Sequence, residues 1–266
     1  KGDREVALRP EMTPTVARMI SARERHYKKP IKWYSFPQVF RYERQQKGRL
    51  REHFQFNADI FGDTDPATDA ELIALLIDVL RAFNLTADDF VIRLSSRNAW
   101  QDFFNEHCSD ESKAYDFYQA VDKLERADPG ESDKKFKSLG FTLEQVRIFI
   151  DSCEPTGELQ AVLDNLTARG LGDYVKIDYN VIRGLAYYTG IVYEAFDRNG
   201  KFRAIAGGGR YDQLVELISG GKKDMPAAGF AMGDVVLTEL LKDRELLPDL
   251  GGNILVFAMI EDETLR

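Results

Sequence analysis

Apolar and polar residues alternate in two neighbouring parts of the chain, and this alternation predicts a pair of strands. Residues 31–44 are rich in aromatic and β-branched side chains, and residues 53–62 alternate between apolar and polar positions. Residues 45–52 between them are polar and contain Gly48. Glycine flanked by polar residues is typical of a hairpin connection. The pattern therefore predicts an antiparallel hairpin over residues 31–62.

A helical spacing replaces the alternation on both sides of this hairpin. Residues 4–27 begin as a strand and continue as a helix, for which we predict Thr13 as the N-cap and Pro14 as the first helical residue. The apolar stripe of that helix would be formed by Val16, Met19 and Ile20. Residues 65–85 predict a strongly amphipathic helix. Its apolar side would carry Leu72, Leu75, Leu76, Val79 and Leu80.

The middle of the chain is charged and helical in its spacing, and it follows a predicted strand at residues 90–97. Three helices are expected, over residues 112–128, 142–153 and 157–170. We interpret residues 128–135 as a polar loop. Because strands resume at residues 174–182, this block is interpreted as a helical insert.

The last third of the chain returns to strands. Residues 186–218 predict two strands around a turn at 197–201, then a glycine run and a helix. Residues 227–246 predict a strand followed by a helix, and residues 254–262 a buried type of strand. Adjacent strands are joined by hairpin-like turns, so we predict an α+β fold: a mostly antiparallel sheet flanked by helices, with a helical insertion.

Composition limits the classes of function. The net charge is −8 over 266 residues, which argues against a protein coated with positive charge for nucleic acid but leaves room for a local basic groove. Two cysteines fit a reducing cytoplasm, and the three histidines lack the spacing of a zinc site. No apolar run approaches the roughly 18 residues of a membrane span. The first residues lack a signal-peptide pattern and predict a strand already in progress, so we expect a missing native start.

Residues 40–59 concentrate cations in this acidic chain. Residues of one parity share a face of a strand, so Arg41 and Glu43 would point to the same side, as would Gln55 and Asp59. Charged groups on an aromatic sheet are unfavourable unless they are paired or bind a ligand. Two interpretations stay open here: a solvated hairpin with weak cross-strand ion pairs, or a binding floor on which arginines such as Arg49 hold phosphate.

Three further clusters carry candidate chemistry. Residues 8–15 place Glu11 and Thr13 at a predicted strand end, where they could bind an ammonium group, although an edge strand running into a helix explains them equally well. Residues 183–190 combine an arginine and two tyrosines. Tyrosines in strands are usually half-buried, with the ring packed and the hydroxyl in contact with water. The glycines at 207–209 match no phosphate-binding motif. They instead predict a close approach of the backbone to a ligand or a neighbouring strand.

In this order and spacing, the clusters resemble the catalytic core of class II aminoacyl-tRNA synthetases, and most closely the histidyl-tRNA synthetase family. FRYERQQKGRLREHFQFNADIFG resembles the second class II motif, and LRPEMTPT the amino-acid loop. RGLAYYTG resembles the histidine-specific signature, whereas GGGRYD and AAGFAMG resemble the stretch leading into the third motif. The resemblance extends over residues 8–240.

The resemblance implies a set of site residues. The catalytic cations would be Arg41 and Arg183, at the α-phosphate of ATP. Histidine would contact Glu11, Thr13, Arg41, Gln55, Asp59, Arg183, Tyr187, Tyr188 and Tyr211. ATP, accompanied by Mg²⁺, would contact Arg41, Glu43, Arg49 and Phe54. The acceptor end of tRNA(His) would face Arg44 and Gln46. No metal-binding side chains are expected.

The resemblance also implies an organisation and an assembly. The catalytic core would comprise residues 1–97 and 172–248, with a tRNA-contacting helical insertion domain at 98–171. Residues 249–266 would begin the anticodon-binding domain. The family relationship implies a cytoplasmic homodimer, although the first class II motif, which builds the dimer interface, is absent from the sequence. We interpret that absence as truncation.

Several positions depart from the family pattern. Val236 stands where the third motif usually has an arginine, and His53 where an aromatic residue usually stacks on adenine, with Phe54 beside it. Ala186 replaces a commoner aspartate, and Asp59 a glutamate. These departures keep two alternatives open: a paralogue that does not aminoacylate, such as the regulatory subunit of ATP phosphoribosyltransferase, and a module that senses histidine or tRNA. Retention of both phosphate arginines favours a synthetase.

Overall fold

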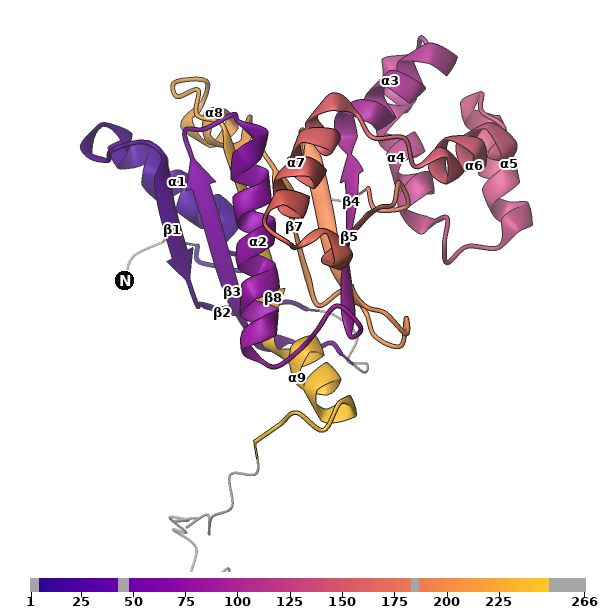
Figure 1. Cartoon of the computed structure of the whole chain (residues 1–266). Coiled ribbons are helices and arrows are strands. Elements are labelled where there is room, and N and C mark those ends of the chain that lie inside the picture. Colours follow the sequence, from indigo (N-terminus) through magenta and orange to yellow (C-terminus); the bar gives the residue numbers. More distant parts are fainter. Residues whose placement is uncertain (1–4, 43–47, 183–186, 249–266) are drawn as a thin grey trace, which may run out of the picture.

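An eight-stranded sheet forms the centre of the molecule (Figure 1). The computed structural model describes residues 5–42, 48–182 and 187–248. The strands are β1 (Ile31–Ser35), β2 (Gln38–Phe40), β3 (Glu52–Phe61), β4 (Phe90–Ser96), β5 (Val175–Ile177), β6 (Ile191–Asp197), β7 (Ala206–Arg210) and β8 (Ala227–Gly233). They follow the order β1-β3-β8-β7-β6-β4-β5, and β2 pairs with β3. Every pair is antiparallel except β4 with β5. The predicted α+β class and mostly antiparallel sheet are therefore confirmed.

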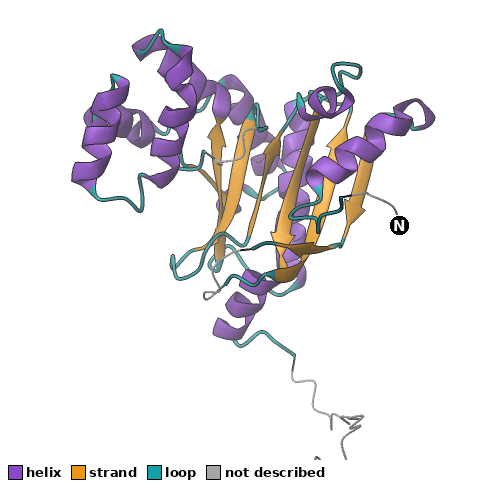
Figure 2. Cartoon of the chain, turned by 180° about the vertical axis from the view of Figure 1, so that it is seen from behind, coloured by secondary structure: helices purple, strands orange, loops and turns teal. Residues whose placement is uncertain are grey.

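Helices cover both faces of the sheet. On one face, α2 (Pro66–Ala82) and α7 (Gly157–Ala168) pack against each other and against the apolar side of β3 and β4. On the other face, α1 (Thr13–Arg23) and α8 (Leu214–Ser219) pack together over residues of β1, β3 and β8 (Figure 2). The short α9 (Asp234–Asp243) continues from the end of β8. Each layer buries one apolar stripe of its helices, as the amphipathic spacing requires.

The remaining helices form a separate group beside the β4–β5 end of the sheet (Figures 1 and 2). They are α3 (Arg97–His107), α4 (Ala114–Lys123), α5 (Pro129–Leu139) and α6 (Leu143–Ser152). Aromatic rings fill the space between these helices, with Trp100 and Phe117 fully buried. Three short 3₁₀ turns lie at Glu24–His26, Glu111–Lys113 and Gly172–Tyr174. The chain between the two sets of strands is helical, as predicted, but its last helix, α7, packs mainly against α2 and the sheet and not with this group.

The N-terminal segment differs from the prediction. Described residues before α1 form no strand, and the carbonyl of Arg9 accepts a single hydrogen bond from the Phe40 amide at 2.9 Å. Pro10 follows and has no N–H to continue a strand. The helix begins at Thr13 itself after Met12, so Thr13 is not the N-cap. Pro14 is tolerated in the first turn because its missing N–H would have no helical partner there.

The interpretation of residues 128–135 as a loop was wrong. Asp128 caps α5 by accepting hydrogen bonds from the amides of Gly130 and Glu131, and Pro129 occupies the first helical position. An aspartate followed by proline is a good helix start, which the polar composition of the segment obscured. In α2, Leu75 is 40% exposed and does not belong to the buried stripe.

Three strand predictions were too long. The strand expected over residues 174–182 is reduced to β5, Val175–Ile177, after a 3₁₀ turn that ends at Tyr174. The predicted strand over residues 31–44 is interrupted between β1 and β2, where Pro37 again lacks a donor. Tyr187 and Tyr188 precede β6 and lie in a turn and loop instead of a strand. The glycines at 207–209 belong to β7 itself.

Among the described residues, we found no helix with the length and apolar character needed to cross a bilayer.

Candidate functional site

A cleft of about 470 Å³ opens on the face of the sheet that carries α1 and α8. Alternate residues of β3 and β8 form its floor, including Gln55 and Gly229. The segment before α1, the end of β2 and the last turn of α4 contribute to its walls. Of the predicted site residues, those that line this cleft are Glu11, Thr13, Arg41, Arg49, Gln55, Tyr187 and Tyr188. The structure thus brings together side chains that are up to 177 positions apart in sequence.

The polar face of β3 is buried, so a solvated hairpin, one of the two open interpretations, does not describe this strand. Gln55, Asn57 and Asp59 are each less than 8% exposed. The Asn57 side chain donates to the Gln55 carbonyl at 3.0 Å. The side-chain oxygens Gln55 Oε1 and Asn57 Oδ1 accept no hydrogen bond from the described part of the protein. Buried polar atoms normally have partners, so an unsatisfied acceptor in a cleft is suited to a donor from a ligand.

Asp59 lies beneath the cleft instead of lining it. Its carboxylate accepts a hydrogen bond from the Tyr211 hydroxyl, and both side chains are 3% exposed or less. Burial raises the pKa of Asp59 to about 7, and the hydrogen bond from Tyr211 opposes that rise. Burial and the neighbouring Asp59 carboxylate raise the pKa of Tyr211 well above its ordinary value. Gly229 lines the cleft above this pair, and a side chain there would collide with the Asp59 carboxylate and the Tyr211 hydroxyl.

The segment before α1 is fastened to the end of β2. Arg41 donates through Nε to the carbonyl of Pro10 at 2.9 Å, and Arg9 donates to the carbonyl of Gln38 at the same distance. Glu11 in turn accepts a hydrogen bond from Tyr187 at 3.0 Å. A carboxylate, a guanidinium and a phenol therefore meet at one end of the cleft.

His53 and Phe54 point to opposite faces of β3, as neighbouring strand residues do. His53 lines the cleft, close to Gly233. Phe54 does not line it; its ring is 47% exposed and stacks on Phe36, with centroids 6.2 Å apart. The structure therefore brings His53, and not Phe54, to the cleft.

Four predicted site residues, Glu43, Arg44, Gln46 and Arg183, lie outside the described residues.

The glycines at 207–209 were predicted to allow a close approach of the backbone to a ligand or a neighbouring strand. A Cβ on Gly208 would lie 2.6 Å from the Phe230 Cβ, and one on Gly209 would lie 2.6 Å from the Ile191 carbonyl oxygen. Both distances are too short for real contacts, so the close approach of neighbouring strands is confirmed.

A family model described as "Histidyl-tRNA synthetase" matches residues 1–235 of this chain. The chain belongs to the histidyl-tRNA synthetase family. It is 47% identical to the histidine–tRNA ligase of Opitutus terrae, over 93% of this chain and 61% of that protein. It is 40% identical to the histidine–tRNA ligase of Thermoplasma volcanium, over 92% of this chain and 60% of that protein. The chain thus spans about three-fifths of the length of these relatives.

Solved structures agree with the fold. A histidyl-tRNA synthetase from Nostoc sp. PCC 7120 superposes with a TM-score of 0.76 at 24% identity, covering 93% of this chain and 63% of that one. A protein from Bacillus halodurans C, described as an ATP phosphoribosyltransferase regulatory subunit/histidyl-tRNA synthetase, has a TM-score of 0.72 at 22% identity, covering 88% of this chain and 64% of that one. At these identities the likeness supports the class II architecture alone.

Sequence reasoning missed one buried ion pair of this histidyl-tRNA synthetase-family chain. Asp69 in the first turn of α2 is 1% exposed and pairs with Arg210 at the end of β7. The signal was present, because Asp69 falls on the buried stripe of α2 with Leu72 and Leu76. A charge on an apolar stripe indicates a buried partner, but nothing local identifies that partner.

The helical group also contributes to the cleft in a way that the sequence did not predict. Asp122 and Glu125, in and just after α4, line the cleft. Arg93 of β4 pairs with Glu125 at 3.3 Å and with Asp178 at 3.4 Å. This arginine therefore links the helical group to the sheet at the edge of the cleft.

Proposed function

We propose that the protein is a histidine–tRNA ligase, which activates L-histidine with ATP to histidyl-adenylate and transfers histidine to tRNA(His). The observation that carries this proposal is a single cleft lined by Glu11, Gln55 and two arginines, Arg41 and Arg49. Glu11 and Gln55 offer acceptors for an ammonium group, and the two arginines offer donors for phosphate. Relatives up to 47% identical are named histidine–tRNA ligases.

The amino-acid end of the cleft would lie at the tyrosines. Glu11, Thr13 and the unpartnered Gln55 Oε1 would accept hydrogen bonds from the α-ammonium group. Tyr187, Tyr188 and the Asp59–Tyr211 pair would select the imidazole ring. An imidazole has two nitrogens, one a donor and one an acceptor in the neutral form. A site that hydrogen-bonds both would strongly reject analogues that lack them.

The nucleotide end would lie towards Arg49 and His53. Arg41, held by the Pro10 carbonyl through Nε, keeps its terminal nitrogens for the histidine carboxylate and the α-phosphate. Arg49 would neutralise the γ-phosphate. Two of the departures from the family pattern, His53 and Val236, both line the cleft, together with Gly233. We propose that His53 takes the place of the usual adenine-stacking ring. Outside the described residues, Glu43 would contact the adenine amino group, and Arg183 the α-phosphate.

The chemistry requires alignment more than a protein nucleophile. A carboxylate oxygen of histidine attacks the α-phosphorus of ATP, and the bond to the β-phosphate oxygen breaks to release pyrophosphate. Both reactants are negatively charged, so neutralising and orienting them accounts for most of the catalysis. In the second step a ribose hydroxyl at the tRNA end attacks the histidyl carbonyl carbon and AMP leaves.

The donor set suits Mg²⁺ that enters with ATP. Within the described ranges, no group of three or more His, Cys, Asp or Glu side chains could hold a metal ion by itself. Mg²⁺ usually keeps waters and binds through one or two carboxylates plus substrate phosphates. The resemblance implied no metal-binding side chain, but Glu194 of β6 is among the carboxylates that line the cleft, and we propose it for this contact. The metal would neutralise phosphate charge.

The wider organisation is also proposed. The helical insertion at 98–171 would contact tRNA, and Arg44 and Gln46 would face its acceptor end. Residues 1–97 and 172–248 would form the catalytic core, and residues 249–266 would begin an anticodon-binding domain. We propose a cytoplasmic homodimer, although one relative, from Arabidopsis thaliana, is described as chloroplastic/mitochondrial.

Histidine-dependent exchange of labelled pyrophosphate into ATP tests the proposal. The purified protein should exchange with histidine and not with other amino acids. Arg41→Lys should lower the exchange rate on the order of a hundredfold, because an ammonium group cannot bind the histidine carboxylate and the α-phosphate at once as a planar guanidinium can. Arg51→Lys is the matched control, since Arg51 is a neighbouring exposed arginine outside the cleft lining. Folded protein without histidine-dependent exchange would overturn the proposal and favour the non-aminoacylating paralogue.

A further inference from the structure

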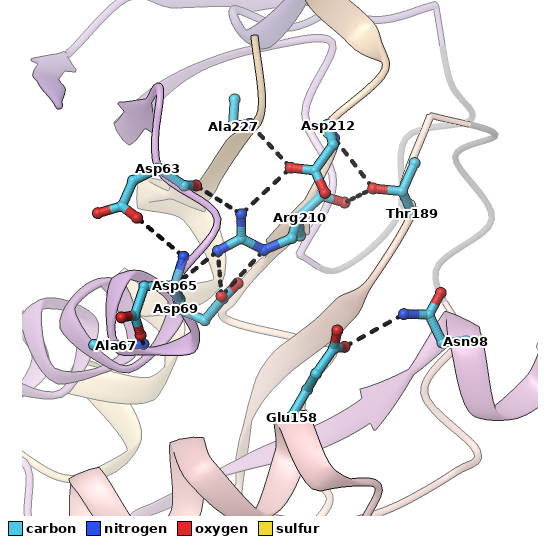
Figure 3. Close-up of polar contacts among 10 residues, drawn as sticks. All are labelled: Asp63, Asp65, Ala67, Asp69, Asn98, Glu158, Thr189, Arg210, Asp212 and Ala227. Atoms are coloured by element: carbon cyan, nitrogen blue, oxygen red, sulfur yellow. Dashed lines mark hydrogen bonds and ion pairs between the residues drawn. The ribbon is translucent and has the colours of Figure 1, made fainter. Parts of the chain in front are cut away.

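The side chain of Arg210 is the centre of a buried polar cluster (Figure 3). Both Nε and Nη2 donate to Asp69 Oδ2. Nη1 donates to the carbonyl of Asp63 at 2.8 Å and to the Asp212 carboxylate at 3.3 Å, and Nη2 donates to the carbonyl of Asp65 at 3.3 Å. Every guanidinium nitrogen is therefore used. A single side chain ties the end of β7 to the loop after β3 and to the first turn of α2.

The same cluster fixes the backbone on both sides of Tyr211 and at Thr189, next to Tyr188. The Arg210 carbonyl accepts a hydrogen bond from the Thr189 amide at 2.9 Å. The Asp212 amide donates to the Thr189 hydroxyl at 3.1 Å, and Asp212 Oδ1 accepts from the Ala227 amide at 3.1 Å (Figure 3). Gly190 packs directly on the Arg210 side chain, since a Cβ there would lie 3.3 Å from Arg210 Cδ.

These hydrogen bonds hold the residues that are adjacent to two tyrosines. Tyr188 is adjacent to Thr189, and Tyr211 lies between Arg210 and Asp212. The rings of Tyr188 and Tyr211 lie 6.4 Å apart, and the Tyr211 hydroxyl is bonded to Asp59. Asp69 and Arg210 are themselves 10% exposed or less and do not line the cleft. Their effect on a ligand must therefore pass through the tyrosines.

We propose that the Arg210–Asp69 ion pair is a positioning device for Tyr188 and Tyr211 and that it sets the affinity of the cleft for histidine without touching the substrate. This inference rests on the proposed function for the identity of the ligand. The nucleotide end is fastened separately, through the hydrogen bond of Arg41 to Pro10. Loss of the ion pair should therefore weaken histidine binding and leave ATP binding unchanged.

The experiment compares Arg210→Met, Arg210→Lys and Asp69→Asn in the pyrophosphate-exchange reaction. We expect Arg210→Met to raise the KM for histidine on the order of tenfold or more, with the KM for ATP within about twofold of the parent. Arg210→Lys should restore part of the loss, because lysine keeps the charge but cannot make the planar set of contacts. Asp69→Asn should have a smaller effect, since Arg210 keeps its bonds to Asp63, Asp65 and Asp212.

Arg244→Met is the matched control. It breaks the Arg244–Asp89 ion pair at 2.9 Å, which lies outside the cleft lining and should lower Tm without changing the histidine KM. If Arg210→Met lowers Tm like Arg244→Met and leaves the histidine KM unchanged, the inference is overturned. If Arg210→Met does not fold, Arg210→Lys and Asp69→Asn are judged by the same criterion.

A second measurement does not depend on activity. ¹³C NMR of the Asp59 carboxyl group should show its pKa rising in Arg210→Met, because a displaced Tyr211 no longer donates to it. A parent protein without histidine-dependent exchange would overturn the proposed function, whereas the NMR measurement would still decide whether Arg210 positions Tyr211. An unchanged Asp59 pKa in Arg210→Met would overturn the positioning role itself.

Discussion

The Tyr211 hydroxyl donates a hydrogen bond to Asp59, although the two residues are 152 positions apart and both are almost completely buried. The pair lies on the cleft side of β3, directly under Gly229 of β8. Burial dominates the electrostatics and raises the pKa of Asp59 to about 7. The pair therefore changes charge close to neutral pH.

Replacing Asp59 should change how stability depends on pH. The native pKa is about 7 and the ordinary value is 3.8, so the native state holds a proton that the unfolded state releases between these values. This contribution to the free energy of unfolding is fully present below pH 4 and is lost as the pH rises through 7; its size is at most about 4 kcal/mol. Asp59→Asn, neutral at every pH, should lack this decline and be more stable than the parent above pH 7.

Urea unfolding at several values between pH 4 and pH 8 measures the difference. Burial raises the pKa of Asp69 to about 6, so Asp69 also makes the free energy of unfolding fall with rising pH. This contribution is the same in the parent and in Asp59→Asn, and it cancels when the two proteins are compared. Equal pH slopes in the parent and in Asp59→Asn would mean that Asp59 is not protonated in the native state.

A methyl group at Gly229 should disturb the same pair. A Cβ there would lie 2.8 Å from both the Ala58 carbonyl oxygen and the Tyr211 hydroxyl oxygen. Because the first of these is backbone, a strand must shift, and we expect Gly229→Ala to lower the free energy of unfolding by about 1–3 kcal/mol. It should also raise the histidine KM, because Gly229 lines the cleft above Asp59 and Tyr211.

Gly157→Ala provides the control for Gly229→Ala. Gly157 is in the first turn of α7, and a Cβ there meets no atom within 4 Å. Alanine should leave stability unchanged or increase it by about 0.5–1 kcal/mol. Equal effects of the two substitutions in thermal unfolding would contradict the steric argument.

The local pattern predicted much of this fold because it reflects local burial. The alternation over residues 53–62 predicted the strand and the shared face of Gln55 and Asp59, since a period of two puts them on the same side. It did not decide whether that face is solvated or buried. The amphipathic spacing of α2 was equally informative. Where polar composition hid a cap, as at Asp128 and Pro129, the prediction failed.

The partners of buried charges could not be predicted in the same way. Arg210 and Asp69 are 141 positions apart. They are neighbours only because the fold brings the end of β7 next to the first turn of α2. The sequence places Asp69 on an apolar stripe but does not say which cation neutralises it. The residue pattern picked out the candidate clusters and the family resemblance supplied their roles. Neither identifies the partner of a buried charge, which is why the roles of Arg210 and Arg93 were missed.

Tyr118 should stabilise the contact between α4 and the start of α3 through a cation–π interaction. The Arg97 guanidinium lies 4.3 Å from the centre of the Tyr118 ring, and burial lowers the pKa of Arg97. The hydroxyl of Tyr118 donates to Gln101 at 2.6 Å. Tyr118→Phe keeps a ring and Tyr118→Leu does not, so we expect Leu to be less stable than Phe by about 0.5–2 kcal/mol.

The same two substitutions in an Arg97→Met background separate this interaction from packing, because a double-mutant cycle removes terms common to both backgrounds. Urea unfolding gives the four free energies of unfolding. If the difference between Phe and Leu persists after Arg97 is replaced, the ring acts through packing alone.

His53 and Phe54 allow a final test of which ring meets the nucleotide. They are adjacent on β3 and face opposite sides of it, with His53 in the cleft and Phe54 stacked on Phe36. Stacking of a base on an aromatic side chain contributes about 1–3 kcal/mol. His53→Ala should therefore raise the KM for ATP on the order of tenfold, whereas Phe54→Ala should leave it within about twofold. Each variant is the control for the other in the exchange reaction. A larger effect of Phe54→Ala would mean that adenine meets the opposite face of β3, and that His53 does not replace the usual stacking ring.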